Sequence, residues 1–344
     1  MKHQTTRYGE IPFYKIGTFG NTADAFISKK LFLEYKTKYS FPKKGDILIS
    51  ASGTIGRAVI YDGKPAYFQD SNIVWIDNDE TLVKNDFLFY AYSNVKWNTE
   101  HTTILRLYND NFRNTLIPLP PLNEQSTIAN ILSDLDRYLY ALDALILKKE
   151  GVKKALSFEL LSQRKRLKGF NQAWQRVRLG DIANYLTSNL SVEQITQQGE
   201  IKVYDVNNFI GYTDTTFISD KPYISIVKDG SVGRVRILPP KTNILSTMGA
   251  LIANHRTTTE FLFYLLSNFD FKNFTSGSII PHIYFKDYKE KTIFLPPLNE
   301  QSAIANILSD LDNEIASLKN KKRQFENIKK ALNHDLMSAK IRVL

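Results

Sequence analysis

Residues 120–136 read PPLNEQSTIANILSDLD, and residues 296–312 read PPLNEQSAIANILSDLD. The two stretches are identical at 16 of 17 positions and lie 176 residues apart. A further match at the same offset follows, because the Lys-Lys-Ala-Leu sequence at 153–156 recurs at 329–332. Agreement of this length at one fixed offset indicates that a whole structural unit has been duplicated. The rest of the chain is interpreted outward from this repeat.

Each copy of the repeat predicts one long helix. The paired prolines favour an extended lead-in, and Asn123 or Asn299 is suited to capping the first turn. The first helix is predicted to run from about 124 to 168, roughly 65 Å at 1.5 Å per residue, ending before Gly169. Apolar residues recur every three or four positions for about five heptads, as in a coiled-coil seam. The seam comprises Ile128, Ile131, Leu135, Leu139, Leu142, Leu145, Val152, Leu156 and Leu160, then Ile304, Ile307, Leu311, Ile315, Leu318, Phe325, Ile328, Leu332 and Leu336.

A helix of this length cannot bury its apolar stripe alone, and its own repeat is the obvious partner. We therefore expect an antiparallel pair within the chain. Two ordinary amphipathic helices in separate domains are disfavoured, because the predicted length far exceeds the usual 11–12 or so residues. Some apolar residues fall outside the seam and are expected to contact either the chain's own domains or a partner subunit. These are Leu132, Tyr138, Ile146, Phe158 and Leu308.

The segments between the helices are rich in strand signals and share landmarks. GDILISASGTIGRAVIY at 45–61 reads as strand, glycine turn and strand, and ISIVKDGSVGRVRIL at 224–238 is its counterpart. A Phe-Leu-Phe-Tyr sequence at 87–90 recurs at 261–264 and predicts a short amphipathic helix in both places. Away from these landmarks the two segments diverge strongly, which indicates constant assembly combined with variable recognition.

These observations predict an α+β fold with a pseudo-two-fold internal repeat. Two strand-rich domains, 1–117 and 169–295, alternate with spacer helices in 118–168 and 296–344. One asymmetry stands out, because the second domain opens with WQRVRLGDI at 174–182 and the first has only eight residues before Gly9. About 18 residues of the repeat unit are therefore missing from the first domain. Either this domain folds without the opening strand, or the chain is a shortened form.

Composition sets broad limits on function. The chain of 344 residues is 43% hydrophobic and 23% charged, as in a folded soluble protein. Its net charge of +10 favours a polyanionic partner, yet the four segments carry +3, +3, +2 and +2, so there is no basic tail. The absence of Cys excludes disulfides, thiolate metal sites and a cysteine nucleophile. No signal peptide or 18-residue apolar stretch is present, so a cytosolic location is expected.

Each strand-rich domain contains a Gly-(Thr/Ser)-(Ile/Val)-Gly-Arg turn and is followed by a Pro-Pro-Leu-Asn-Glu-Gln helix start. This combination resembles the specificity subunit of type I restriction–modification enzymes. The WQRVRLGDI opening is also similar to the start of that family's target recognition domains. The resemblance covers essentially the whole chain, because order, spacing and duplication agree. The short beginning of the first domain is the one departure.

The resemblance implies a subunit that performs no chemistry. Each target recognition domain would read one half of a split sequence in double-stranded DNA, and the paired helices would set the distance between the half-sites. The helices would also dock two methyltransferase subunits, which bind S-adenosylmethionine and methylate adenine. Restriction and translocase subunits would join for cleavage.

The residues themselves agree with an absence of catalysis. There is no GxxxxGK[ST] loop, since Gly63-Lys64 precedes Pro65, and no GxGxxG run. The Asn/Asp-Pro-Pro-aromatic motif of amino-methyltransferases is also absent. The five histidines, His3, His101, His255, His282 and His334, show no metal-ligand spacing, so we predict neither a metal nor a cofactor in this chain.

DNA contacts require Arg, Lys, amide or hydroxyl side chains on a rigid surface. Candidates follow the glycine turns or lie in polar stretches ahead of the helices, and each has the plain alternative of an exposed, solvated side chain. Arg57 and Arg234 could instead pair locally. The candidates are Arg57, Arg106, Asn109, Asn111 and Arg113 in the first domain, and Arg234, Arg236, Ser276, Ser278, His282 and Lys286 in the second.

Two other functions were weighed against a DNA-recognition subunit. A self-contained methyltransferase or nuclease fused to a recognition module is disfavoured, because two domains and two helices leave no residues for a catalytic domain. A coiled-coil module that binds other proteins is the weaker third possibility.

Overall fold

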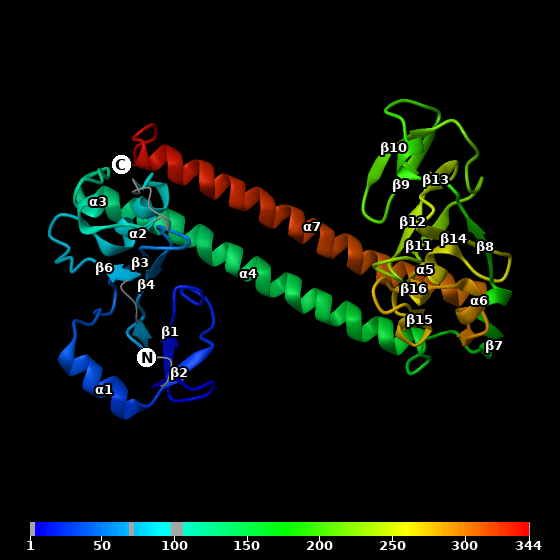
Figure 1. The fold of residues 1–344 in the computed structure, drawn as a ribbon, viewed down its shortest axis with the longest axis horizontal. Coiled ribbons are helices and arrows are strands. Elements are labelled where there is room, and N and C mark those ends of the chain that lie inside the picture. The colour runs from blue at the N-terminus through cyan, green and yellow to red at the C-terminus, as the bar shows by residue number, and fades with distance from the viewer. Residues whose placement is uncertain (1–3, 69–71, 98–105, 344) are drawn as a thin grey trace. The chain divides into compact units, whose positions relative to one another are not determined.

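The computed structural model describes residues 4–68, 72–97 and 106–343, which form two compact units (Figure 1). Unit 1 comprises residues 1–143 and 320–344, and unit 2 comprises residues 144–319. Each unit contains one strand-rich domain and part of each long helix, α4 (Leu122–Leu161) and α7 (Leu298–Met337). The predicted α+β fold with a duplicated unit is confirmed.

The two long helices begin directly after the proline pairs and contain 40 residues each, about 60 Å at 1.5 Å per residue. Asn123 lies inside the first turn, where its Oδ1 accepts the Glu124 N–H at 2.9 Å, so the capping position predicted for it was wrong by two residues. The predicted end near 168 was also wrong. Gln163 adopts a left-handed φ of 62° and the Lys165 N–H reaches the Glu159 carbonyl at 3.1 Å, which ends α4 at Leu161.

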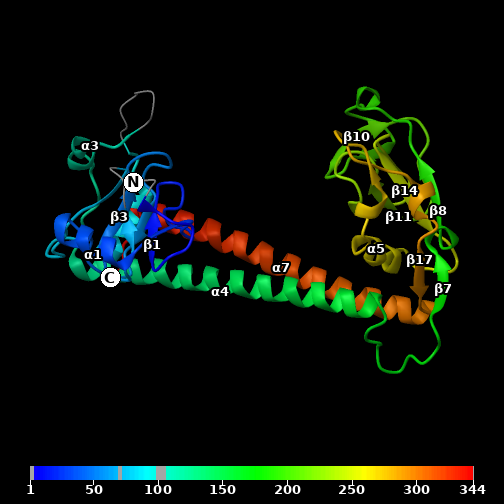
Figure 2. The same cartoon turned by 60° about the horizontal axis from the view of Figure 1, so that its bottom comes forward.

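The helices pair in antiparallel fashion within each unit, as predicted (Figure 2). Along the pair, residue numbers rise on α4 as they fall on α7. The ion pairs of unit 1 are Asp143–Lys322 at 2.7 Å, Asp136–Lys329 at 2.5 Å and Glu124–Arg342 at 2.8 Å. Those of unit 2 are Lys149–Glu314 at 2.7 Å, Glu150–Lys319 at 2.6 Å, Lys153–Asp312 at 2.5 Å and Arg166–Glu300 at 2.6 Å.

The domain of unit 1 is built on two small sheets. Sheet β4-β3-β6 is antiparallel, and in β2-β1-β5 the β1–β5 pair is parallel. Strand β3 is wholly buried, because both of its faces are covered. The elements are β1 (Ile11–Tyr14), β2 (Ala25–Ile27), α1 (Lys29–Lys38), β3 (Ile47–Ser50), β4 (Ala58–Ile60), β5 (Tyr67–Phe68), β6 (Ile73–Trp75), α2 (Asn85–Asn94) and α3 (Asn109–Arg113).

The domain of unit 2 repeats this plan with additional strands. Sheet β12-β11-β14-β8 has one strand more than its counterpart, and β17 pairs with β7. The elements are β7 (Gln175–Arg178), β8 (Ala183–Thr187), β9 (Ile201–Tyr204), β10 (Phe209–Thr213), β11 (Tyr223–Val227), β12 (Val235–Leu238), β13 (Thr242–Ile244), β14 (Met248–Ala253), α5 (Thr259–Ser267), β15 (Thr275–Ser276), β16 (His282–Ile283), α6 (Phe285–Tyr288) and β17 (Thr292–Leu295).

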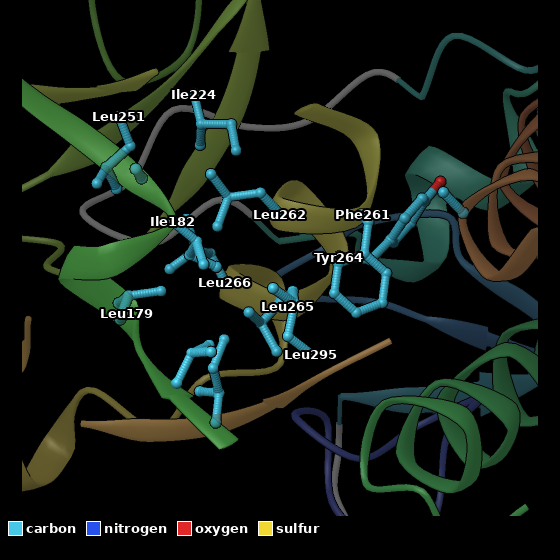
Figure 3. Packing of buried hydrophobic residues seen from close by; sticks show 14 of the residues in the cluster. Leu179, Ile182, Ile224, Leu251, Phe261, Leu262, Tyr264, Leu265, Leu266 and Leu295 are labelled. Carbon is cyan, nitrogen blue, oxygen red and sulfur yellow. The ribbon is translucent and has the colours of Figure 1, made fainter. Parts of the chain in front are cut away.

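The main core of unit 2 lies between this sheet and helix α5 (Figure 3). Leu262 and Leu266 on α5 face Ile224 and Leu251 of the sheet, and all four are almost fully buried. Leu308 of α7 belongs to the same cluster, and in unit 1 Leu132 of α4 packs likewise with Phe87 on α2. These two residues outside the seam therefore contact the chain's own domains.

Two aspartates of the repeat attach the short helices to the long ones. Asp136 accepts the Tyr90 hydroxyl at 2.8 Å, and Lys329 lies 5.5 Å from the centre of the Tyr90 ring. Unit 2 repeats the arrangement with Tyr264 and Asp312 at 2.9 Å. Burial is the main cause that raises the pKa of Tyr90 far above its usual range, and the hydrogen bond to Asp136 raises it further. The hydroxyl therefore remains a donor at all ordinary pH values.

The glutamine of the Asn-Glu-Gln sequence holds the other end of each short helix. Fully buried Gln125 donates through Nε2 to the carbonyls of Leu82 and Pro120, at 2.9 and 2.8 Å, and its Oε1 accepts the Lys84 N–H at 2.8 Å. Gln301 forms the same three contacts with Arg256, Pro296 and Thr258. This glutamine clamp fixes the loop before α2 or α5 to the start of a long helix.

Candidate nucleic-acid interface

A glycine turn joins the central strand of each domain to its neighbour. In unit 1, Gly53 and Gly56 have φ values of 66° and 80°, and the Gly56 N–H donates to the Ser50 carbonyl at 3.0 Å. In unit 2, Gly230 and Gly233 have φ values of 84° and 80°, with an equivalent bond to Val227 at 2.9 Å. Side chains other than glycine rarely adopt such φ values, which explains the shared spacing of the glycines.

An aromatic ring covers the second glycine in both units. A Cβ added to Gly56 would lie 2.2 Å from Nε1 of Trp97, and one added to Gly233 would lie 2.6 Å from the Phe271 ring. No side chain fits in either place. The turn is therefore packed closely against an aromatic ring in both units.

Two predicted residues, Arg106 and His282, occupy the same place in the two domains. Arg106 forms a β-bridge with Ser52 and His282 forms one with Asp229, so each lies beside the residue that precedes the first turn glycine. The Arg106 guanidinium donates to Oδ1 of Asn72 at 3.0 Å, and Nδ1 of His282 lies 2.6 Å from Oδ1 of Asp229. Both side chains are half-buried and directed by these contacts.

The arginines that follow the turns reach the loop after β1 in unit 1 and the loop after β9 in unit 2. Arg57 donates to the Phe19 carbonyl at 2.9 Å. Arg234 donates to Oδ1 of Asn207, and Arg236 to its carbonyl, each at 2.9 Å. Arg57 and Arg234 therefore do pair locally, which was the alternative considered for them. Both residues are nevertheless exposed to solvent.

The remaining candidates lie on nearby elements. In unit 1, Asn109 is exposed, the Asn111 side chain accepts the Tyr108 N–H at 2.6 Å, and exposed Arg113 lies 3.6 Å from Asp110. Asn111 is thus occupied in capping its own short helix α3. In unit 2, Ser276, Ser278 and Lys286 are exposed, and the pairing of β15 with β16 places Ser276 opposite His282.

Sequence reasoning missed Asn207 and Asn72, which orient the arginines. Asn207 receives both Arg234 and Arg236, and Asn72 receives Arg106. Each lies some 27 to 34 positions from its arginine, and no spacing rule connects them. It also missed Ile279, which is 92% exposed at the tip between β15 and β16.

No cluster of three or more potential metal ligands occurs among the described residues. His3 and His101 lie outside the described residues. In the part of the chain that the structure describes, no helix is both long and apolar enough to cross a membrane.

Comparison with known proteins places this arrangement in a family. The model of the type I restriction modification DNA specificity domain matches residues 1–149 and again residues 171–327. A putative type I restriction enzyme specificity subunit of Haemophilus influenzae is 63% identical over 137 residues, which are 40% of this chain and 36% of that protein. A putative type I restriction enzyme MjaX specificity subunit of Methanocaldococcus jannaschii is 28% identical over 337 residues, 87% of this chain and 79% of that protein.

Solved structures share the fold. The S subunit of a type I restriction–modification system from M. genitalium superposes with a TM-score of 0.63 at 20% identity, over 98% of this chain and 91% of the other. A chain from a study of complex assembly and conformational transition of the type I R-M system gives 0.53 at 16% identity, over 86% and 82%.

Proposed function

This chain belongs to the family of type I restriction–modification specificity subunits, and we propose that it reads a bipartite DNA sequence and docks the subunits that modify it. The single observation that carries the proposal is the equivalence of Arg106 and His282. Two domains present a polar side chain at the same point beside the same glycine turn, yet the residues differ. Such a pair is suited to reading two different half-sites.

The chemistry of the candidate residues supports direct reading of bases and phosphates. Arginine recognises guanine in the major groove, and a guanidinium or free backbone N–H also binds phosphate. Arg57 and Arg234 stand at the exposed end of a rigid turn, so both donors are positioned before DNA arrives. Lys286 and the serines Ser276 and Ser278 extend the surface of unit 2.

Docking of two methyltransferase subunits is supported by apolar side chains that the long helices leave exposed. Tyr140, Leu147, Val152 and Phe158 on α4 are all exposed. On α7, the position equivalent to Val152 is Ile328, which is exposed as well, and the proposal places one copy of the partner at each of these two residues. In this proposal S-adenosylmethionine is bound by those subunits, restriction and translocase subunits join the same assembly, and the whole complex acts in the cytoplasm.

The proposal assigns no catalytic step to this chain. Its residues bind and orient the duplex, while the methyltransferase subunits supply the base-modifying chemistry. The test is co-expression with the methyltransferase subunits, followed by sequencing of methylated adenine. We expect a split motif with adenine methylated in both halves. A continuous palindrome, or S-adenosylmethionine binding and methylation by the pure chain, would contradict it.

A further inference from the structure

Each domain carries an exposed tyrosine two residues after the side chain that is suited to reading its half-site. Tyr108 follows Arg106, and Tyr284 follows His282 at the offset of 176. Of the seven residues from 106 to 112, the tyrosine is the only one that is repeated at that offset. The two domains therefore share one side chain in the middle of a segment where their sequences otherwise differ.

The backbone holds the two tyrosines in equivalent places. The residue before each tyrosine is buried, and its N–H donates to the carbonyl of the residue two positions ahead of the first turn glycine. Leu107 donates to Ala51 at 2.8 Å, and Ile283 donates to Lys228 at 2.9 Å. Both tyrosines have extended backbone angles, with φ of −103° and −117°. Each tyrosine is therefore fixed beside the glycine turn of its own domain.

Each tyrosine faces the same side as the reading residue before it. Successive side chains of an extended segment point to opposite faces, so residues two apart share a face at a separation of about 6.6 Å. In unit 2 the rings of His282 and Tyr284 lie 6.5 Å apart, with an angle of 21° between their planes. Such a separation is about two base-pair steps of 3.4 Å. A duplex that contacts His282 is thus within reach of Tyr284 as well.

Packing within the domains does not account for these tyrosines. Tyr108 is 43% exposed and Tyr284 is 49% exposed, and neither ring belongs to a hydrophobic cluster of the described residues. By contrast, Tyr90 and Tyr264, which are also repeated, are buried and donate to the aspartates of the repeat. Tyr284 is exposed although unit 2 includes β7 and β8. The exposure therefore does not depend on the strands that distinguish the two domains.

Positively charged side chains lie beside both tyrosines. Nζ of Lys286 is 5.5 Å from the centre of the Tyr284 ring. In unit 1 the position of Lys286 is taken by Asp110, whose carboxylate lies 3.6 Å from the guanidinium of Arg113. A phenol among cations suits a polyanion, because its hydroxyl can donate to a phosphate oxygen while its ring packs on the sugar.

We infer that Tyr108 and Tyr284 are positioning residues for DNA, each donating its hydroxyl to a phosphate oxygen of one half-site. This inference rests on the proposed function, in which Arg106 and His282 read bases. Contacts to phosphate fix the orientation of a protein on the duplex and carry no sequence information. The same residue can therefore serve both half-sites, whereas the reading residue beside it has to differ.

The test uses the full chain in complex with its methyltransferase subunits, a duplex with the methylated motif, and duplexes altered in either half-site. We expect Tyr108→Phe and Tyr284→Phe each to weaken binding to every duplex about tenfold, because each removes one hydrogen bond to a charged group. The ratio of affinities between the motif and the altered duplexes should stay unchanged. The salt dependence should stay unchanged too, because tyrosine is uncharged. Tyr39→Phe, on a residue that is 48% exposed at the end of α1, should bind as the parent does.

A second measurement separates a DNA contact from a structural role. Phosphates of the motif are replaced one at a time by neutral methylphosphonates. We expect one phosphate in each half-site whose replacement weakens the parent complex but has no further effect on the corresponding Tyr→Phe variant. A merely structural role would not produce such coupling.

Four results would overturn the inference. They are unchanged affinity in both variants, additive effects at every phosphate, relaxed specificity at one base pair, which would indicate a base contact, and weaker assembly with the methyltransferase subunits, which would indicate a protein contact. A parent complex without preference for a bipartite duplex would instead contradict the proposed function itself, and this inference with it.

Discussion

The guanidinium of Arg342 forms two hydrogen bonds with the carboxylate of Glu124, at 3.3 and 2.8 Å. The pair repeats as Arg166 with Glu300, each member displaced by 176 residues. The segment that follows one long helix is thus tied to the start of the other in both units. Because these ties cross more than a hundred residues of sequence, they hold the ends of the antiparallel pair closed.

The two arginines should not contribute equally to stability. Glu300 is completely buried and Arg166 mostly so, whereas the side chain of Arg342 is 67% exposed. Loss of either arginine leaves a buried carboxylate without its partner, but Glu300 has none of the slight access to solvent that Glu124 keeps. We expect Arg166→Ala to lower the melting temperature of unit 2 more than Arg342→Ala lowers that of unit 1. Lys340→Ala, on an exposed residue near Arg342, is the control. Equal effects would show that burial does not set the difference.

The free energy of unfolding of unit 1 should depend on pH in the acidic range because of Glu124. The hydrogen bond from Arg342 holds the pKa of Glu124 below its usual 4.5. The unfolded chain therefore takes up this proton at higher pH than the folded chain does. The contribution is fully present above about pH 4.5 and is lost as the pH falls through the lowered value. Urea unfolding between pH 7 and 3 should show a shallower acid dependence for Glu124→Gln than for the parent chain.

The glutamine clamp should be costly to remove. Gln125→Ala would leave the Lys84 N–H and two carbonyls without the fully buried glutamine side chain that pairs with them. We expect a loss of about 1–3 kcal/mol in the free energy of unfolding of unit 1. Gln301→Ala should act similarly on unit 2. Exposed Gln197→Ala serves as the control, and a clamp variant as stable as that control would contradict the assignment.

Substitution at the equivalent recognition positions should affect one half-site each. Arg106→Ala should relax specificity in one half of the methylated motif, and His282→Ala in the other, at about 1–3 kcal/mol if each contacts a base. Methylome sequencing of both variants, co-expressed with the methyltransferase subunits, measures this. Circular dichroism would confirm that each variant is folded. Simultaneous changes in both halves would argue against two independent readers.

The spacer between half-sites should follow the length of the long helices. Deleting residues 143–149 together with the facing residues 316–322 removes about 10 Å from each helix. At about 3.4 Å per base pair, roughly three base pairs should disappear from the spacer. Inserting one heptad in each helix should add roughly three base pairs to the spacer. An unchanged spacer in both variants would rule out this measuring role.

The duplication made much of the fold predictable. An offset of 176 located the two long helices, and recurring motifs at offsets of 177 and 174 located the two glycine turns and the short helices α2 and α5. The end of α4 was not predictable, because Arg166 leaves the helical path toward Glu300, which is 134 residues away. Helix propensity contains no information about such a partner. The boundaries of the strand-rich segments and the base-contacting residues stay predictions.

The candidate site shows the same limit. Glycine spacing identified both turns, since positive φ angles demand that residue. Arg106 and His282 are related by the same offset of 176, but only the bridges to Ser52 and Asp229, across about fifty residues, show that both lie beside a glycine turn. No sequence pattern pointed to Asn207. It matters only through the two arginines that fold onto it.

The glutamine clamp has a consequence for how such proteins change through time. The hydrogen bonds that Gln125 and Gln301 share are made to two main-chain carbonyls and one main-chain N–H, groups that every loop of that shape offers. A joint of this kind makes no demand on the side chains of the domain it holds. A domain that keeps this loop shape and the tyrosine that meets Asp136 or Asp312 could therefore be exchanged by recombination for a diverged one, and the chain would still close.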